Sequence, residues 1–346
     1  MALIKQTVNP FGGNMFTRRK VFTALIIFVC LALISAPVFA KSHSLKLQCV
    51  YNENTLGGTT TLIVAKKIED YTNGQVKVKI FWPGQLVKVG SAYNSLSKGM
   101  IQGVAANSIY FGGIVPEVKT ELMPLAWKSS QDALDLYYEK GFRDILNDAH
   151  REKGVYFGGA TFAGTMVFLT KFPVRTLDDF KGKKIRAMSA FADVVKKLGA
   201  SPTPMANTEQ YMALRTGVID GTVFPLDTIK NFKFYEVIDY VVLPGIFNPV
   251  TMGFFFNDKW FTSLPSDLQT KIDKAVYDTS VESMALSDKF DQGGLDVAKK
   301  ENLKIVQFSD QDLQIIQKYA TEGWEDIAAL SPRCRKLVDL IKENLN

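Results

Sequence analysis

The sequence predicts an α/β protein made of two similarly built lobes. Strand-like and helix-like segments alternate along the chain, which is the pattern of a mostly parallel sheet with helices on its faces. A short pattern of spaced residues also recurs about one lobe's length further on. The 346 residues exceed the size that one hydrophobic core usually organises, so we expect two cores.

The first alternation lies at residues 45–80. Residues 45–50 alternate apolar and polar side chains as a strand does, and the apolar side chains of residues 64–71 fall on one face of a helix. Asn73-Gly74 ends that helix. Residues 76–80 alternate again as a second strand, which Trp82-Pro83-Gly84 stops. This is the βαβ unit that begins a parallel sheet.

The recurring pattern indicates that the two lobes are alike. Each copy reads as a helix, a glycine stop and a buried strand, and the matched residues are Tyr93, Leu96, Gly99, Ile101 and Gly103 in the first copy and Tyr211, Leu214, Gly217, Ile219 and Gly221 in the second. Gly99 and Gly217 would supply the left-handed residue that closes each helix. Ligands of open parallel sheets bind beyond the carboxyl ends of the strands. Residues 107–110 and 224–227 follow the two strands, so we expect a site between the lobes there.

The first 40 residues have the features of a signal peptide. They hold four basic residues and no acidic one, an apolar run at residues 21–34 and small residues before Ala40. We expect cleavage after Ala40 and export to the periplasm. The apolar run is shorter than the ~20 residues that span a bilayer as a helix, which disfavours the alternative of an uncleaved anchor.

The exported chain is expected to be nearly neutral and soluble. Removing residues 1–40 takes the 41 basic residues to 37 against 35 acidic ones, so the formal charge of +6 belongs mostly to the signal. Net charge therefore gives no argument for nucleic-acid binding. No second hydrophobic span follows. Cys49 and Cys334 remain, and the sequence leaves open whether they form a disulfide.

Motifs of catalytic chemistry are missing from the sequence. The only histidines are His43, near the new N-terminus, and His150, which we expect at an exposed helix end. Neither belongs to a metal-binding pair, and no HExxH, CxxC, G-x-S-x-G or phosphate-binding loop occurs. We expect no enzyme activity, no metal and no cofactor. The alternative from another class is a secreted α/β enzyme that uses Asp or Glu side chains.

The second half of the chain resembles the DctP-type substrate-binding proteins of TRAP (tripartite ATP-independent periplasmic) transporters. The most specific segment is Leu177–Arg186, LDDFKGKKIR, which is similar to the family's DLKGLKIR. The other similar segments, in the family's order, are residues 198–205, 209–221, 233–237 and 260–269, with Gly74, Gln85-Leu86 and Leu122–Leu125 in the first half. The likeness covers nearly the whole exported chain.

The resemblance implies a periplasmic receptor of the type II-like, Venus-flytrap kind, which closes on a small organic acid and delivers it to the permease subunits of the membrane transporter. It implies discontinuous lobes, with residues 41–163 and 250–290 in lobe I and residues 164–249 and 291–346 in lobe II. A long helix after Pro265 would span both. We expect a monomer. A receptor that feeds a sensor instead of a transporter is the alternative.

The family's carboxylate-binding arginine falls at Arg186. A guanidinium is planar, permanently charged and matches a carboxylate with two parallel hydrogen bonds. The alternative is a surface arginine in an ordinary ion pair, which contributes little.

Departures from the sialic-acid-binding members suggest the kind of acid. Where those members have a second arginine, a ligand-contacting asparagine and a ring-contacting phenylalanine, this chain has Met166, Phe224 and Asn207. At two of these positions, Met166 and Phe224, an apolar side chain stands where those members have a polar ligand-contacting one. We therefore expect a monocarboxylate with an apolar or aromatic body, and the alternatives are a C4-dicarboxylate or a sugar acid. Met166 and Phe224 could also be plain core residues.

Five further polar or aromatic residues are candidates for the cleft. Asn207 is either a ligand contact or the N-cap of the helix that follows it. Asn107 and Tyr110 align with a ligand-contacting stretch of the family's first lobe, and Tyr51 and Glu53 follow the first strand. We expect Trp127 and Phe162 to be core residues, and the alternative is that either forms a wall for an aromatic ligand.

Overall fold

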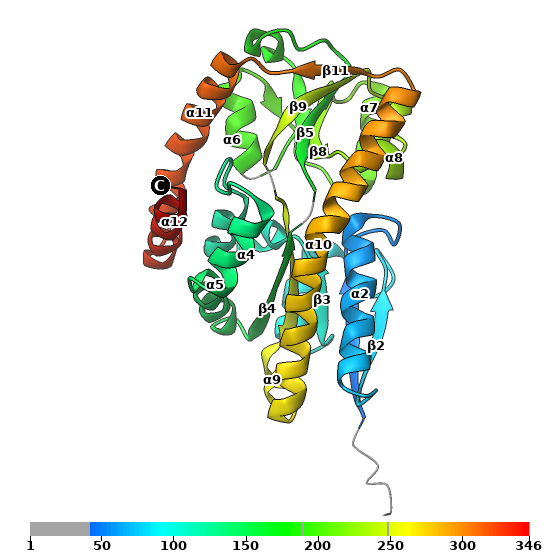
Figure 1. The fold of residues 1–346 in the computed structure, drawn as a ribbon, viewed down its shortest axis with the longest axis vertical. Coiled ribbons are helices and arrows are strands. Elements are labelled where there is room, and N and C mark those ends of the chain that lie inside the picture. Colours follow the sequence, from blue (N-terminus) through cyan, green and yellow to red (C-terminus); the bar gives the residue numbers. More distant parts are fainter. Residues whose placement is uncertain (1–41, 163, 189, 248, 346) are drawn as a thin grey trace, which may run out of the picture. The chain divides into compact units, whose positions relative to one another are not determined.

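The computed structural model describes residues 42–345 except residues 163, 189 and 248, and two β-sheets organise them (Figure 1). The predicted signal peptide lies outside the described residues. Each sheet has its own buried apolar residues and its own covering helices. The structure confirms the α/β architecture with two lobes.

The sheet of the first lobe begins with the predicted βαβ unit. In spatial order its strands are β2 (Val76–Phe81), β1 (His43–Cys49), β3 (Gly103–Ala106), β10 (Thr251–Asn257) and β4 (Val155–Phe162). β1 runs parallel to β2 and β3, whereas β10 runs antiparallel to β3 and β4. The accompanying helices are α2 (Leu56–Tyr71), α3 (Val89–Ser97), α4 (Ser130–Tyr138), α5 (Phe142–Arg151) and α9 (Asp258–Thr262).

The sheet of the second lobe is built from chain between and after these strands. Its spatial order is β11 (Lys304–Gln307), β9 (Tyr240–Phe247), β5 (Met166–Thr170), β8 (Gly221–Pro225), β6 (Lys184–Arg186) and β7 (Ser201–Pro202). β6 pairs in parallel with both β7 and β8. The helices α6 (Ala190–Lys197), α7 (Gln210–Thr216) and α8 (Thr228–Asn231) follow strands of this sheet.

The recurring sequence pattern corresponds to matching elements in the two lobes. α3 leads through Gly99 to β3, and α7 leads through Gly217 to β8. Both glycines have left-handed backbones, with φ of 75° and 74°, because the chain must reverse its twist where each helix ends. The segments that follow β3 and β8 therefore lie at corresponding places in the two lobes.

The chain passes between the sheets after β4 and again after β9, and the 35-residue helix α10 (Ser266–Lys300) spans both lobes. Three polar side chains on one face of α10 form hydrogen bonds with the backbone of the segment that leaves β4 for the second lobe. Ser283 Oγ lies 3.0 Å from Phe162 N, Ser287 Oγ accepts from Gly164 N at 2.6 Å, and Asp291 Oδ2 accepts from Thr165 N at 3.0 Å. Phe162 ends the edge strand β4, and Gly164 and Thr165 follow it in the connection to the second lobe, so these side chains of α10 satisfy backbone N–H groups at the point where the chain crosses.

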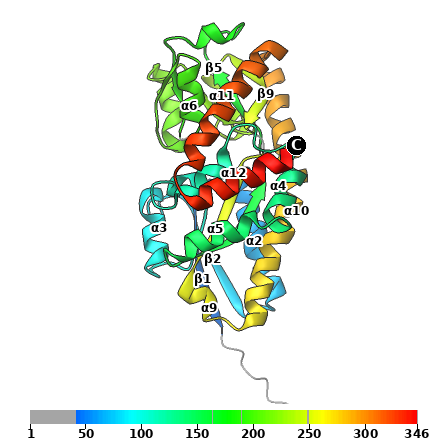
Figure 2. The ribbon, with the colours of Figure 1, turned by 90° about the vertical axis from the view of Figure 1, so that its left-hand side faces the viewer.

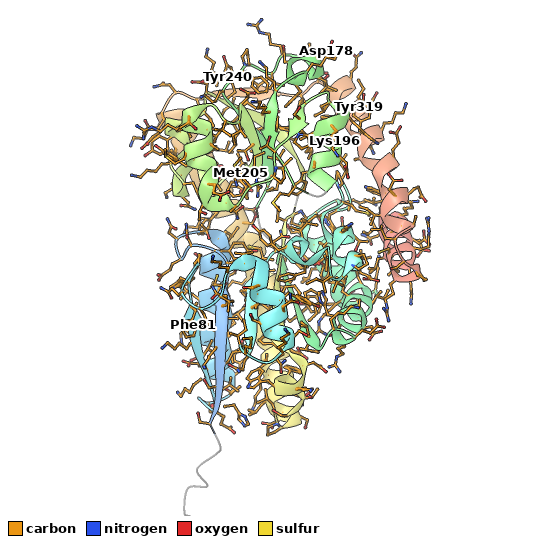
Figure 3. All side chains as sticks on the ribbon, turned by 180° about the vertical axis from the view of Figure 1, so that it is seen from behind. Phe81, Asp178, Lys196, Met205, Tyr240 and Tyr319 are labelled. Carbon is orange, nitrogen blue, oxygen red and sulfur yellow. The ribbon has the colours of Figure 1, made fainter. Side chains whose placement is uncertain are left out.

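The C-terminal helices correct one expected boundary. α11 (Asp310–Ala328) places Ile316 in the core of the second lobe and Trp324 in that of the first. α12 (Pro332–Leu345) then packs Leu337, Val338 and Ile341 into the first core. Figure 2 shows α12 beside α4 and α5, and Figure 3 shows Tyr319 of α11 near Lys196 of α6. The prediction that residues 291–346 all belong to lobe II is wrong for α12, because its apolar face completes the first core.

His150 is also placed differently from the prediction. It is fully buried, and its Nδ1 lies 2.8 Å from the hydroxyl of Tyr93. Phe142, Leu146 and Ala149 are buried on the same side of α5, so the helical period carries His150 into the core rather than to the surface. Burial lowers the pKa of His150 to about 3.

The remaining predictions about the core can be compared directly. Trp127 and Phe162 are buried in the first core, as predicted. Cys49 and Cys334 are both buried and both free, so the structure contains no disulfide between them. In the described part of the chain, no helix combines the length and the apolar character that a membrane crossing needs.

Candidate functional site

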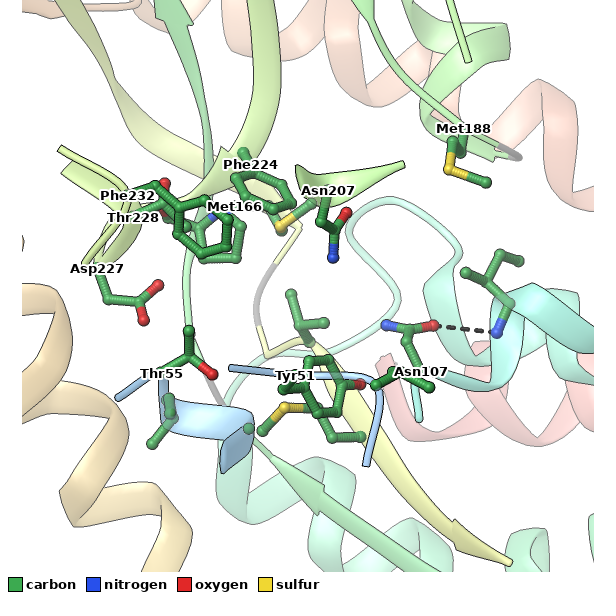
Figure 4. Close-up of a pocket in the computed structure, with 18 of the residues that line it drawn as sticks. Tyr51, Thr55, Asn107, Met166, Met188, Asn207, Phe224, Asp227, Thr228 and Phe232 are labelled. Atoms are coloured by element: carbon green, nitrogen blue, oxygen red, sulfur yellow. Dashed lines mark hydrogen bonds between the residues drawn. The ribbon is translucent and has the colours of Figure 1, made fainter. Parts of the chain in front are cut away.

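A cavity of about 120 Å³ lies between the two lobes, and we call it the interlobe cavity (Figure 4). About 10–15 Å³ of such space admits one water molecule, so this volume has room for a small organic molecule. Its lining residues are Val50, Tyr51, Asn52, Thr55, Leu56, Gly57, Asn107, Ile109, Tyr110, Leu122, Gly164, Met166, Arg186, Met188, Phe191, Asn207, Thr208, Phe224, Pro225, Asp227, Thr228, Phe232, Val250 and Met252. Of the eight predicted site residues, all but Glu53 are in this set.

Arg186 is the last residue of β6 and lines the interlobe cavity with only 4% of its surface exposed. Its Nη2 donates to Asn207 Oδ1 at 3.0 Å and to the carbonyl of Met205 at 3.3 Å. Nε donates to the same carbonyl at 3.4 Å. Met205 lies at the edge of the second lobe that faces the first (Figure 3). These bonds hold one edge of the guanidinium and leave Nη1 without a hydrogen bond to any described residue.

The guanidinium of Arg186 has no acidic partner among the described residues. Burial lowers its pKa, and the Tyr110 hydroxyl acts in the opposite direction. Every neighbour that accepts from it is neutral. A buried charge without a counter-ion is costly, and an anion in the interlobe cavity would supply one.

An apolar wall from the second lobe lies beside this charge. The Phe224 ring centroid is 5.2 Å from Cζ of Arg186, within the range of a cation–π contact. Phe232 packs edge-on to Phe224 at 5.8 Å, and Met166 lies next to both rings in Figure 4. Phe224 and Met166 are 6% and 4% exposed. They therefore belong both to the core of the second lobe and to the wall of the interlobe cavity, so the two roles considered for them are not exclusive.

Two asparagines, Asn207 and Asn107, line the interlobe cavity. Asn207 begins the short 3₁₀ helix η4 (Asn207–Glu209), whose N-cap is Ala206, so the predicted capping role of Asn207 is wrong and its Oδ1 serves Arg186 instead. Asn107 is the N-cap of η1 (Ser108–Phe111). Its Oδ1 accepts from Ile109 N at 3.0 Å and its Nδ2 donates to the carbonyl of Thr251 at 3.1 Å.

The first lobe contributes two tyrosines to the interlobe cavity, and both are half-buried. Burial raises the pKa of Tyr51, and it also raises the pKa of Tyr110 although Arg186 and Asn207 act to lower it. Both hydroxyls are therefore neutral donors and acceptors. Glu53 is exposed and does not line the interlobe cavity. Its place two residues beyond Tyr51 suggested the site, but the chain turns outward before α2 begins.

The sequence placed residues 224–227 near the site but did not single out Asp227, which lines the interlobe cavity and is only 5% exposed. Burial raises the pKa of its carboxyl group, while Asn231 and the backbone N–H groups of Leu56 and Thr228 act to lower it. Asn231 Nδ2 donates to Oδ2 at 3.0 Å. The signal was present, because Asp227 ends the segment that follows the repeated strand β8.

The residues of the interlobe cavity are suited to binding rather than to metal chemistry. Within the described residues no group of three or more His, Cys, Asp and Glu side chains is arranged to hold a metal ion. The interlobe cavity instead offers a buried guanidinium, aromatic faces and neutral amide and hydroxyl groups. This combination orients a small ligand by one ionic contact and surrounds the rest of it with apolar surface.

Comparison with known families matches residues 48–330 to the bacterial extracellular solute-binding protein family 7, DctP. This match covers well over half of the chain. The chain belongs to the DctP family. The predicted resemblance to the substrate-binding proteins of TRAP transporters is thereby confirmed.

Two curated DctP-type relatives are similar over much of their length. The C4-dicarboxylate-binding periplasmic protein DctP of Rhodobacter capsulatus is 29% identical over 299 residues, covering 85% of each chain. The sialic acid-binding periplasmic protein SiaP of Vibrio cholerae serotype O1 is 28% identical over 226 residues, covering 64% of this chain and 68% of its own. Both are periplasmic proteins, which supports the predicted location of this DctP-family chain.

A solved structure confirms the fold. The TRAP periplasmic solute-binding protein of Desulfovibrio salexigens, with bound orotic acid, superposes with a TM-score of 0.81 at 24% identity, over 88% of this chain and 98% of its own. The DctP-family chain therefore has the two-lobed periplasmic binding-protein fold, with discontinuous lobes and a long helix through both.

Proposed function

We propose that this protein is the periplasmic receptor of a TRAP transporter, that it binds one small organic acid through an ion pair between Arg186 and a carboxylate, and that it delivers the acid to the membrane permease. The observation that carries the proposal is Arg186 itself: a guanidinium 4% exposed, lining the interlobe cavity, with no acidic partner among the described residues. The relatives named above bind a C4-dicarboxylate and sialic acid, and both ligands are acids.

The walls of the interlobe cavity favour a monocarboxylate with an apolar or aromatic body. Arg186 is its only lysine or arginine within the described residues. A second carboxylate lying against Met166 and Phe224 would lose its hydrogen bonds to water and find no donor there, at a cost of roughly 1–3 kcal/mol per unsatisfied group. An aryl or branched aliphatic body would instead pack against the Phe224 and Phe232 rings.

Binding measurements on matched variants test this proposal. We expect aryl and branched aliphatic monocarboxylates to raise the melting temperature of the wild-type protein and to be recovered unchanged, because a receptor gains stability from its ligand without consuming it. Arg186→Ala should weaken the binding of the tightest-binding acid by at least ~30-fold, since removing one partner of a buried charged pair costs about 2–5 kcal/mol. Lys184→Ala is the control, because Lys184 is exposed on the same strand.

Three results would contradict the proposal. One is unchanged binding of the same acid by Arg186→Ala. Another is tight binding of sialic acid together with no binding of any aryl or branched aliphatic acid. The third is turnover of the bound acid, which would favour the alternative of a secreted enzyme.

A further inference from the structure

Asp227 places a second buried charge in the interlobe cavity. The residue is 5% exposed, and its carboxyl group accepts a hydrogen bond from the neutral side-chain amide of Asn231 at 3.0 Å. Within the described residues no lysine or arginine forms an ion pair with it, and the groups that act to lower its pKa are the neutral amide of Asn231 and backbone N–H groups, among them those of Leu56 and Thr228. Asp227 therefore has neutral hydrogen-bond partners, as Arg186 does.

A second carboxyl group, that of Asp291, interacts with Asp227. Asp291 of α10 accepts from Thr165 N through Oδ2, and its Oδ1 is buried with no hydrogen-bond partner among the described residues. Burial raises the pKa of Asp291 to about 7, and the charge of Asp227 acts in the same direction. α10 approaches closely here, since an added Cβ on Gly294 would lie 2.2 Å from the carbonyl oxygen of Leu226. A side chain at position 294 would therefore clash with the backbone just before Asp227.

The two charged residues line different parts of the interlobe cavity. In Figure 4 Asp227 lies at the left above Thr55, and Asn207, which accepts from Arg186, lies to its right. Between them are the apolar side chains of Phe224, Phe232 and Met166. The interlobe cavity thus presents a positive group, an apolar wall and a negative group in that order.

We propose that the acid bound by this receptor is zwitterionic, with a cationic nitrogen at the end remote from its carboxylate, and that Asp227 binds this nitrogen. This inference rests on the proposed pairing of the carboxylate with Arg186. A ligand of this kind supplies a counter-ion to both buried groups at once, whereas a simple acid would leave the carboxyl group of Asp227 buried without one. The ligand class is therefore the ω-amino acids and the amino-substituted aryl acids.

Pairs of probes with the same shape test the inference. 4-(Aminomethyl)benzoate and 4-ethylbenzoate share a ring, a carboxylate and a two-atom substituent, and differ in one cationic nitrogen; 5-aminopentanoate and hexanoate form an aliphatic pair of the same kind. We expect calorimetry on the wild-type protein to give roughly tenfold to hundredfold tighter binding of the amino member in at least one pair, the range for one charge-assisted hydrogen bond.

Substitution of Asp227 separates recognition from packing. Asp227→Asn keeps the shape and the contact with Asn231, so it should remove the preference for the amino probe while binding of the neutral-tailed probe stays within a few-fold. Asp288→Asn is the control, because Asp288 is exposed on α10 and does not line the interlobe cavity. It should leave both probes unaffected.

The possible outcomes separate a failure of the zwitterion inference from a failure of the proposed function. If wild-type protein binds the neutral-tailed probe as tightly as the amino probe, the zwitterion is wrong and the Arg186 pairing stands. If Asp227→Asn weakens the binding of both probes equally, Asp227 contributes to the packing between the lobes and does not recognise the cationic nitrogen. If no probe of either pair binds, this inference and the proposed function both fail. Should the variant not fold, the wild-type preference alone decides.

Discussion

The exchange Asn207→Asp changes one atom beside Arg186 and gives the guanidinium an internal counter-ion. Asn207 Oδ1 already accepts from Arg186 Nη2 at 3.0 Å, so the introduced carboxylate needs no rearrangement to form an ion pair. A ligand carboxylate would then approach a guanidinium that is already neutralised, and would meet a like charge next to it. We expect anion binding to fall and the stability of the ligand-free protein to rise.

The size of the effect follows from this geometry. Two unit charges ~4 Å apart attract by about 4 kcal/mol at the effective dielectric of about 20 that applies near a protein surface. Asn207 is only half-buried, so solvent screening and the desolvation of the new carboxylate reduce the net gain to about 1–3 kcal/mol. The dissociation constant of the tightest monocarboxylate should therefore rise roughly tenfold to hundredfold.

Calorimetry and thermal unfolding, with Asn207→Ala as the neutral control, separate charge from the loss of a hydrogen bond. Both variants should bind the acid less tightly, but only Asn207→Asp should raise the melting temperature without ligand, since Asn207→Ala removes a bond and adds nothing. Binding to Asn207→Asp should also recover as the pH falls and the new carboxylate takes up a proton. The reasoning is refuted if Asn207→Asp binds the acid like the wild type at neutral pH.

Two further predictions concern stability. Gly294→Ala should destabilise the fold by more than ~2 kcal/mol in urea unfolding, because the new Cβ would lie 2.2 Å from the carbonyl oxygen of Leu226. The control Gly293→Ala adds a Cβ that meets nothing within 4 Å, so it should stabilise the fold by about 0.5–1 kcal/mol. Equal effects of the two substitutions would contradict the close packing at Gly294. The second prediction concerns His150, whose pKa is about 3 in the folded protein against 6.5 in the unfolded chain. Below pH 6.5 the unfolded chain binds a proton that the folded protein does not. As the pH falls from 6.5 to 3, the free energy of unfolding should therefore fall by up to roughly 4–5 kcal/mol. His150→Gln should flatten that part of the pH profile, and an unchanged profile would show that His150 is accessible to protons when folded.

The architecture could be predicted because it depends on local periodicity. The alternation at residues 45–80 and the glycine-ended helices before β3 and β8 are short-range patterns, and both occur as expected in the two lobes. His150 was misplaced because charged residues surround it in the sequence, and only the full period of α5 shows that it shares a face with Phe142 and Leu146. The position of α12 depends on which core it covers, and no local pattern specifies that.

The candidate site was predicted in part. Arg186 followed from a segment of ten residues that resembles the family, and Met166 and Phe224 from departures at positions where the family contacts its ligand. Residues 224–227 were expected at the site, but Asp227 was not singled out, because nothing in the sequence shows that its side chain is buried without a lysine or arginine partner among the described residues. Glu53 was included for the opposite reason, since a strand end indicates nearness to the site but not the direction of a side chain.

Both charged groups proposed to recognise the ligand belong to the second lobe. Arg186 ends β6 and Asp227 follows β8, and these strands are hydrogen-bonded neighbours in one sheet. Their separation is therefore set by that sheet and does not depend on how far apart the lobes stand. Among the described residues, those that the first lobe adds to the interlobe cavity are all neutral, including Tyr51, Asn107 and Thr55. Selection by charge spacing can thus be complete on one lobe, while contacts from the other lobe add affinity by excluding water from two ion pairs already formed.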